Sequence, residues 1–328
     1  MWYEFILSSI SVICAGFYLT KYGDEISEKS GISGGFIGFF LLALATSLPE
    51  LITSISAVVF QNAPELAFGN IFGSNLFNIT ILVIVDYLSK NGVFVKAGRE
   101  NLVSIAYIII ISLLAIIPVI LYINFGIGFF KQLPINIESI FILFFYLFIL
   151  MTFKQSSEDV PVEKVKSGEK LLPVYAKFTL SALVIVFAGF FLTKSVDSIA
   201  ITYNLGKTFA GSMFLAFVTS LPEATVSISA VRIGAIEMAV GNVLGSNVFN
   251  VLIVFFADIF SKRQILYLQE LKSSIVTGLF SILIAGVCLY GIIKKSGKSK
   301  FLFNKLSGPS IFILIIYALG MYFTYIVK

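Results

Sequence analysis

Two glutamates, Glu50 and Glu223, stand inside apolar stretches that are long enough to cross a membrane. Each is the last residue of the same five-residue sequence, TSLPE. On insertion scales a charged side chain at the centre of a spanning helix costs about 2.5 to 3.5 kcal/mol, and such groups usually serve a function. Two carboxylates neutralise one divalent cation or two monovalent cations. The pair therefore suits a site that holds either kind of ion.

The residues around each glutamate add further oxygens on one helical face. Residues at i, i+3, i+4 and i+7 share a face, and Pro49 and Pro222 lack the amide hydrogen that would bond the carbonyls of Ala45 and Val218. Hard cations such as Ca2+ and Na+ prefer carboxylate, carbonyl and hydroxyl oxygens. The two stripes that offer them are Ala43, Thr46, Ser47, Glu50, Ser54 and Ala57, and Ala216, Thr219, Ser220, Glu223, Ser227 and Ala230.

A second motif, GNxxGSNxFN, follows each TSLPE. Its glycines allow close helix approach, and helix packing alone is the plainer interpretation of them. The motif also places an amide or hydroxyl every four residues along one face, at Asn70, Ser74 and Asn78 and again at Asn242, Ser246 and Asn250. Such oxygens can complete the shell of a cation without adding charge. The polar stripe therefore favours ligation.

Two further carboxylates, Asp86 and Asp258, lie eight residues beyond Asn78 and Asn250. They fall on roughly the same helix faces, near opposite membrane surfaces. We interpret them as interfacial carboxylates in contact with water. The alternative is a vestibule that attracts cations.

The elements that position these residues are predicted to be membrane-spanning helices. Of 328 residues, 58% are hydrophobic and 12% are charged, whereas about a quarter are charged in a soluble domain. About 20 apolar residues cross a bilayer. The sequence predicts ten spans: Tyr3 to Thr20, Gly34 to Phe60, Ala67 to Leu88, Leu102 to Phe125, Ile137 to Phe153, Val174 to Thr193, Phe209 to Val231, Met238 to Phe260, Ser273 to Ile293 and Ser310 to Val327.

The basic residues predict how the spans are oriented. Connectors after the odd-numbered spans, with their flanks, contain most of the 23 lysines and arginines, so the positive-inside rule favours both termini outside a plasma (inner) membrane. This distribution also explains the net charge without a nucleic-acid partner. These basic residues are Lys21, Lys29, Lys90, Lys96, Arg99, Lys154, Lys164, Lys166, Lys170, Lys177, Arg232, Lys294, Lys295, Lys298, Lys300 and Lys305.

An internal repeat relates the two halves of the chain. Ten of 13 positions from Thr46 to Val58 are identical to those from Thr219 to Val231, and seven of ten match between Gly69 to Asn78 and Gly241 to Asn250. Five spans in each half make the second copy enter the membrane from the opposite side. We therefore expect an all-α membrane protein with ten transmembrane helices in two inverted five-helix repeats, residues 1–153 and 173–328, joined by a cytoplasmic linker, residues 154–172.

These motifs resemble the alpha repeats of the sodium/calcium exchanger family, within the cation/calcium exchanger superfamily. The resemblance is specific in two segments, about Phe36 to Asn78 and Phe209 to Asn250. It implies an ion site that binds one Ca2+ or several Na+, usually three, with access alternated by sliding of the first and sixth helices. The implied site residues are Ala43 (through its backbone), Thr46, Ser47, Glu50, Ser74, Asn78, Ala216, Thr219, Ser220, Glu223, Ser246 and Asn250.

The sequence departs from the family pattern at particular residues. Ala45 and Val218 stand where the family often has glycine before the threonine. Asn250 stands where potassium-dependent and certain archaeal members have aspartate, so the resemblance implies potassium-independent exchange. The linker is also too short for the large cytosolic calcium-sensing domains of animal relatives.

We therefore expect an antiporter that exchanges Na+ for Ca2+, electrogenic if a third Na+ is carried. A Ca2+/H+ antiporter is the alternative, because a buried glutamate can also carry a proton. A channel is disfavoured by the inverted repeat, and an enzyme by the lack of any histidine, cysteine pair or serine–base dyad. Cys14 and Cys288 lie in separate spans, and we expect no cofactor, no obligate protein partner and a lipid bilayer as the surroundings.

Overall fold

The chain folds into helices. The computed structural model describes residues 1–90, 92–128, 133–158, 171–203, 216–261, 264–297 and 305–327. Their elements are α1 (Trp2–Ser30), α2 (Gly34–Phe36), the π-helix η1 (Ile37–Leu42), α3 (Ala43–Val59), α4 (Pro64–Leu88), α5 (Val93–Lys96), α6 (Arg99–Phe125), α7 (Ile137–Glu158), α8 (Leu171–Thr202), α10 (Leu221–Arg232), α11 (Ile236–Phe260), the 3-10 turns η3 (Ile265–Tyr267) and η4 (Gln269–Leu271), α12 (Lys272–Ile293) and α13 (Gly308–Ile326).

Most helices agree with the predicted spans, but α8 continues to Thr202, past the predicted end at Thr193, and the ends of α7 and α8 extend into the predicted linker, residues 154–172. Within the described residues, eight segments are long and apolar enough to cross a membrane, and Ile137–Phe153 is a shorter apolar helix. Of the seventh predicted span, residues 209–215 lie outside the described residues, and α10 forms its second part. The protein is therefore an all-α polytopic membrane protein with about ten long helices.

Helix α1 is longer than the sequence predicted. We expected this span to end at Thr20, before Lys21, but α1 continues to Ser30 and ends at Gly31, whose φ of 72° forms a left-handed cap. Glycine adopts this conformation without a Cβ penalty, and it commonly terminates helices. Hydropathy located the apolar part of the helix, whereas the glycine sets its end.

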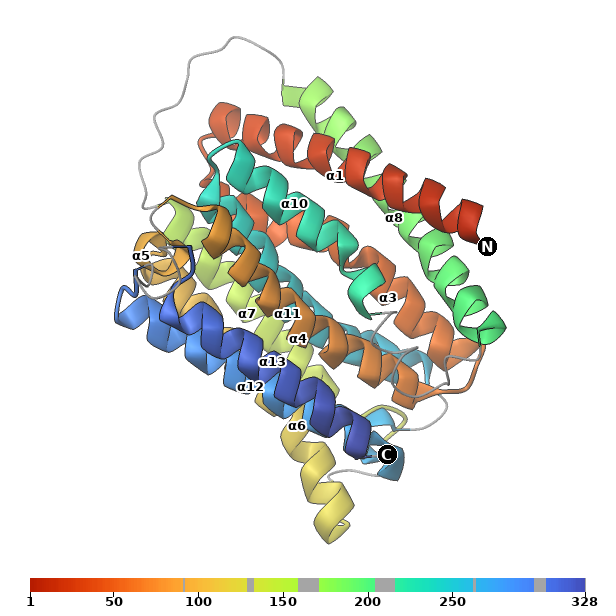
Figure 1. Cartoon of the computed structure of the whole chain (residues 1–328). Coiled ribbons are helices and arrows are strands. Elements are labelled where there is room, and N and C mark those ends of the chain that lie inside the picture. Colours follow the sequence, from red (N-terminus) through yellow and green to blue (C-terminus); the bar gives the residue numbers. More distant parts are fainter. Residues whose placement is uncertain are drawn as a thin grey trace.

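Helices α4 and α11 form the centre of the bundle, with α3 and α10 packed against them (Figure 1). In the most apolar part of α11, 78% of the residues are buried, compared with 22% in α8. Helices α1 and α8 pack on one another at the outside. They run in opposite directions, as α3 and α10 do (Figure 1).

Glycines let α11 approach the first half of the chain closely. A Cβ on Gly241 would overlap the carbonyl of Gly35, and one on Gly245 would overlap the carbonyl of Phe39. The GNxxGSNxFN motif of α11 thus lies directly against η1 and the start of α3. This is the close approach that the sequence predicted for these two glycines.

The interpretation of Asp86 and Asp258 as water-exposed carboxylates is wrong. Asp86 is 0% exposed and Asp258 is 1% exposed. Asp86 accepts hydrogen bonds from the amides of Val93 and Ser307 and from the Ser310 hydroxyl, at 2.9, 2.8 and 2.7 Å. Both its oxygens are therefore satisfied inside the protein, at the N-terminus of α13, where a negative charge also suits the helix dipole.

Asp258 makes the equivalent contacts at the other end of the bundle. Its carboxylate accepts from the amides of Ile265 and Asn136, at 3.1 and 2.6 Å, and from the Ser139 hydroxyl at 2.6 Å. Asn136 and Ser139 stand at the start of α7. Each aspartate therefore fastens a helix of the opposite half of the chain, and neither forms a vestibule.

Candidate cation site

The TSLPE segments adopt different backbones in the two halves. Helix α3 follows the π-helix η1 and continues through Pro49, whereas α10 begins at Leu221 with Pro222 in its first turn and Ser220 outside the helix. Proline is tolerated in a first turn but removes a hydrogen bond inside a helix. The sequence predicted the same interruption twice, and the structure has it in two forms.

The two threonines make the same contact in both halves. The Thr46 hydroxyl donates to the carbonyl of Ala43 at 3.3 Å, and the Thr219 hydroxyl donates to that of Ala216 at 3.3 Å. Each alanine carbonyl therefore contacts the threonine of its own polar stripe. The resemblance assigned these two backbone positions to the ion site.

Contacts between the halves bring the two motifs into one cluster. The Ser47 hydroxyl donates to Oε1 of Glu223 at 2.9 Å. Thr46 and Ser246 hydroxyls are 3.3 Å apart, and those of Thr219 and Ser74 are 3.5 Å apart. The cluster thus draws on α3, α4, α10 and α11 together with the helical residues just before α10.

All twelve implied site residues are buried. The exposed fraction is 8% at Ala216 and 3% or less at the other eleven. Most of the twelve are polar, in a part of the protein surrounded by apolar side chains. A buried polar atom without a partner loses the hydrogen bonds that water would give. The cluster must therefore satisfy its oxygens internally or with a bound group.

Several of these atoms have no hydrogen-bond partner within the described residues. They include both carboxylate oxygens of Glu50, Oε2 of Glu223, the side-chain amides of Asn78 and Asn250, and the Ser220 hydroxyl. The salt bridges found in the same residues, Met1 with Glu4 and Lys29 with Glu25, involve neither buried glutamate. Unpaired oxygens around two acidic side chains fit a bound cation, which takes oxygen ligands.

The donor set is poor in acidic ligands. In the described part of the chain, no group of three or more His, Cys, Asp or Glu side chains is placed to hold a metal ion. A cation bound here would rely on two carboxylates and on neutral hydroxyl, amide and carbonyl oxygens. Sites of few charges and many neutral oxygens favour weak, exchangeable binding of hard ions over permanent retention.

Asn70 and Asn242 have a role that the sequence did not reveal. The Asn70 amide donates to the carbonyl of Glu50 at 3.5 Å and to the Ser54 hydroxyl at 3.1 Å. The Asn242 amide donates to the carbonyl of Glu223 at 3.2 Å and to the Ser227 hydroxyl at 3.0 Å. Their place in the four-residue stripe suggested ligands. The amide nitrogens hold the backbone of each glutamate, and the Asn70 oxygen has no hydrogen-bond partner among the described residues, so ligation by these side chains stays a prediction.

A second pair, Asn75 and Asn247, lies where α4 and α11 cross. The Asn75 amide donates to the Asn247 carbonyl at 3.2 Å, while the Asn247 amide donates to Val243 in its own helix at 2.8 Å. Both residues are buried. The sequence signal was present, since both belong to the repeated GSN, but they lie off the polar stripe.

Comparison with known proteins agrees with these features. The profile of the family described as sodium/calcium exchanger protein matches residues 1–154 and 174–327. The sodium/calcium exchanger MaX1 of Methanosarcina acetivorans is 29% identical over 285 residues, covering 76% of this chain and 79% of that protein. The inner membrane protein YrbG of Escherichia coli is 28% identical over 270 residues, covering 76% and 78%.

A solved structure gives the same fold. The sodium-calcium exchanger NCX_Mj, soaked with Na+ and Sr2+, aligns with a TM-score of 0.69 and 21% identity, covering 97% of this chain and 96% of that one. At this identity the likeness shows the fold alone. The fold and the matched motifs together point to one family.

Proposed function

We propose, because the chain belongs to the sodium/calcium exchanger protein family, that it is a secondary active antiporter that exchanges Na+ for Ca2+ by alternating access. The chain is a membrane ion exchanger of this family and not an enzyme. The choice of ions is our proposal. The observation that carries it is the buried pair of Glu50 and Glu223, in which three of the four carboxylate oxygens have no partner among the described residues.

Charge balance supports the two ions. Two carboxylates neutralise one Ca2+ or two Na+, so either loading leaves the buried site without net charge. The surrounding oxygens are neutral and suit both ions. A third Na+ would make each cycle move net charge and thus be electrogenic. The relative MaX1 is named a sodium/calcium exchanger, which is consistent with these ions.

Asn78 and Asn250 favour exchange without potassium. Both are fully buried, and their amides have no partner in the described residues. An amide at each position supplies an oxygen without a charge, so the site holds two acidic groups and no more. A K+ ion carried together with Ca2+ would have no further carboxylate to balance its charge.

The proposed architecture follows the repeat. We propose two inverted five-helix repeats, residues 1–153 and 173–328, with residues 154–172 as a cytoplasmic linker and both termini outside. The opposite directions of α1 and α8 and of α3 and α10 support this arrangement (Figure 1). The excess of basic residues in alternate connectors supports the orientation in a plasma (inner) membrane.

Substitution of the two glutamates tests the proposal. We expect Glu50→Gln or Glu223→Gln to abolish uptake of radioactive calcium into sodium-loaded proteoliposomes, because glutamine keeps the shape and removes the charge that balances the ion. Glu65→Gln is the matched control, since Glu65 lies in the first turn of α4, outside the cluster. Wild-type uptake by either site variant would overturn the assignment.

The coupling ion is tested separately with the wild-type protein. A sodium gradient without a pH gradient should drive calcium uptake, and a pH gradient in sodium-free buffer should not. The reverse result would replace Na+ by H+ as the counter-ion. Uptake that needs neither gradient and follows calcium passively would refute antiport.

A further inference from the structure

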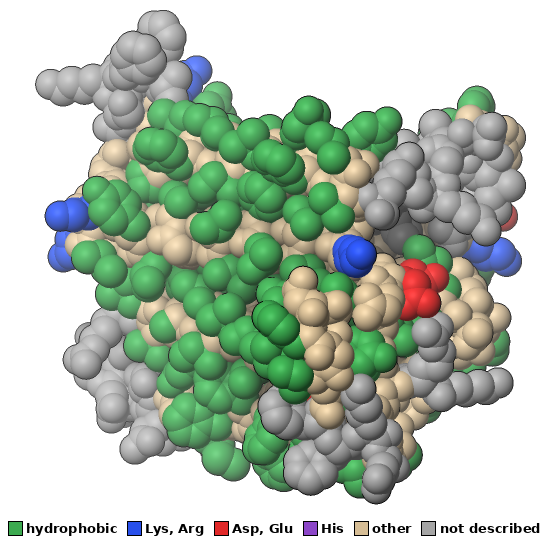
Figure 2. All heavy atoms as spheres, turned by 90° about the horizontal axis from the view of Figure 1, so that it is seen from below, with side chains coloured by type: hydrophobic (Ala, Val, Ile, Leu, Met, Phe, Trp, Pro, Cys, Tyr) green, Lys and Arg blue, Asp and Glu red, His purple; other side chains and the backbone are tan. Residues whose placement is uncertain are grey.

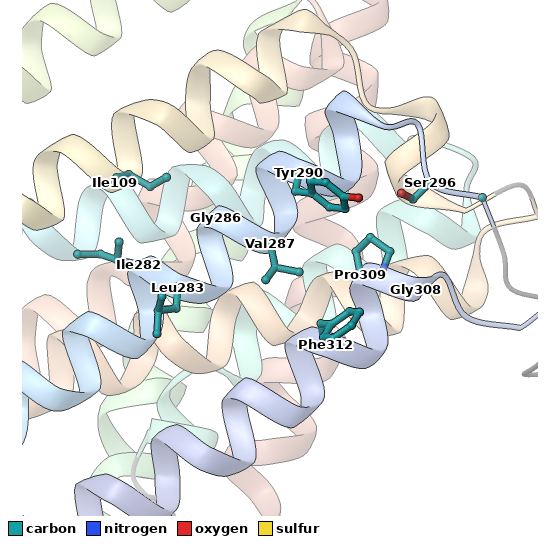
Figure 3. A pocket seen from close by; sticks show the side chains of 11 residues that line it. Ile109, Ile282, Leu283, Gly286, Val287, Tyr290, Ser296, Gly308, Pro309 and Phe312 are labelled. Carbon is teal, nitrogen blue, oxygen red and sulfur yellow. The ribbon is translucent and has the colours of Figure 1, made fainter.

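A groove on the outer surface of the second half lies beside α12 and α13 (Figure 3). It has a volume of about 870 Å³ and is lined mainly by α12 and α13, with Ile109 of α6 at its edge. Pockets of about 300 to 1,000 Å³ are typical of ligand sites. The lining side chains are apolar, apart from the Tyr290 and Ser296 hydroxyls.

The groove is part of the packed fold. Helices α12 and α13 contact closely at Gly291, where a Cβ would lie 2.8 Å from Pro309, and at Gly320, where it would lie 3.0 Å from Phe280. The groove lies between these two contacts along α12. A Cβ on Gly286 would meet no atom within 4 Å. This glycine, with Gly308, leaves the space open.

The groove faces lipid and has the length of one leaflet. Leu283, Tyr290 and Phe312 are 55%, 59% and 61% exposed, within helices that are apolar enough to span the membrane. Figure 2 shows mainly hydrophobic side chains over the face that includes this region. From Leu283 to the end of α12 at Ile293 is ten residues, or about 15 Å at 1.5 Å per residue. Half of a hydrocarbon core is also about 15 Å.

The end of the groove that reaches the membrane surface is basic. Lys294, Lys295 and Lys305 are exposed there, and the sequence from Lys294 to Ser307 contains no acidic residue. The nearby carboxylate of Asp86 is buried and already accepts from Ser307 and Ser310. It therefore satisfies the N-terminus of α13, and the salt bridges found among the described residues involve neither Lys294 nor Lys295. Lysine clusters directly beside a spanning helix favour anionic lipids.

We infer that this groove binds an anionic phospholipid, with one acyl chain along Gly286 and Phe312 and the phosphate beside Lys294 and Lys295. An apolar channel as long as one leaflet, ending at exposed lysines, matches both parts of such a lipid. A zwitterionic lipid would fill the channel but would gain less from the lysines. The site is separate from the buried glutamates and does not depend on the ions transported.

Native mass spectrometry of the full chain tests the inference. The protein is purified in mixed micelles that contain equal amounts of phosphatidylglycerol and phosphatidylcholine, and the retained lipid is counted. We expect preferential retention of phosphatidylglycerol. Each lysine near the surface contributes about fivefold in affinity, so Lys294→Gln with Lys295→Asn should reduce retention by about 25-fold. Asparagine suits position 295, where φ is 45°.

Two further variants separate the parts of the site. Gly286→Phe should fill the groove and reduce retention of both lipids, because its side chain enters open space. Lys272→Gln is the matched control, since Lys272 begins the same helix at its other end. Equal retention of the two lipids, or an equal loss in Lys272→Gln and the double lysine variant, would overturn the inference. If Gly286→Phe does not fold, the exposed lysine variants still decide it.

Discussion

At Asp86 and Asp258 the two halves of the molecule make the same set of contacts. Each carboxylate accepts from one amide just beyond its own helix, and from an amide and a serine hydroxyl at the start of a helix in the other half. Asn70 and Asn242 likewise make equivalent pairs of hydrogen bonds. In these places the repeat in sequence is also a repeat in structure.

At the glutamates the halves differ. Ser47 donates to Glu223, but its equivalent, Ser220, has no partner among the described residues, and neither has the Glu50 carboxylate. A Cβ on Gly245 would lie 2.8 Å from that of Ala43, whereas the equivalent distance from Gly73 to Ala216 is 3.5 Å. The two TSLPE segments, although identical in sequence, thus adopt different backbone conformations, and the helices around them pack at different distances.

This contrast indicates which parts are free to exchange conformations. Two near-identical segments that hold different conformations differ little in intrinsic energy, so each can adopt the form of the other at small cost. The aspartate and asparagine contacts, which are the same in both halves, need not change when they do. We call the equivalent contacts of Asp86, Asp258, Asn70 and Asn242 the frame. The proposed alternating access would then be an exchange of the two TSLPE conformations while the frame stays unchanged.

The largest expected effect is on the free energy of unfolding, at the two aspartates of the frame. We expect Asp86→Ala and Asp258→Ala each to lower the free energy of unfolding by about 3 kcal/mol or more, because three buried donors lose a charged acceptor. The measurement is denaturation of the purified protein in detergent. The two losses should agree within about 1 kcal/mol, given equivalent contacts. A large effect at one aspartate alone would break the symmetry claimed for the frame.

A smaller effect is expected at Ser47 and Ser220, where substitution should change the apparent calcium affinity with opposite sign in the two halves. Ser47→Ala removes a hydrogen bond to a carboxylate, worth about 1.5 to 3 kcal/mol, from this conformation. Ser220→Ala removes none here and would act on the exchanged conformation. The apparent calcium affinities on the two sides of sided proteoliposomes should therefore shift in opposite directions. Shifts in the same direction would argue against exchange of the two TSLPE conformations.

The smallest effect is expected where the outer helices contact the core. A Cβ on Gly189 in α8 would lie 2.7 Å from the Pro49 ring, and one on Gly16 in α1 would lie 2.8 Å from the Thr225 methyl group. The proline ring is rigid, whereas threonine can change rotamer. Gly189→Ala should cost about 1 to 2 kcal/mol and Gly16→Ala less than about 1 kcal/mol. Thermal unfolding of the two variants side by side compares them, and equal losses would contradict this reasoning.

Much of the candidate site could be predicted because its signals are local. The spacing of Thr46, Ser47 and Glu50 places them on one helical face, and repetition of the motif distinguishes them from incidental polar residues. Apolar composition located the helices, although a backbone cap at Gly31 was needed to end α1. The family resemblance is confirmed by the profile match. The cation ligands themselves stay a prediction.

The remaining features depend on contacts between distant residues. Asp86 contacts Ser307 and Ser310, which lie 221 and 224 positions away, and a lone aspartate near a helix end gives no sign of such partners. The bond from Ser47 to Glu223 joins the two halves across 176 positions. The different backbones at Pro49 and Pro222 cannot be read from motifs that are identical in both halves.

The contacts of Asp86 also affect how the chain is made. Helix α13 is synthesised after α4 to α12, so Asp86 enters the membrane long before Ser307 and Ser310 exist. Until then the Val93 amide is the only one of its three donors that has been synthesised. Asp258, by contrast, finds Asn136 and Ser139 already made. A chain that stops after α12 would leave Asp86 with one of its three donors, so the first half of the protein reaches its full set of contacts only when α13 is made.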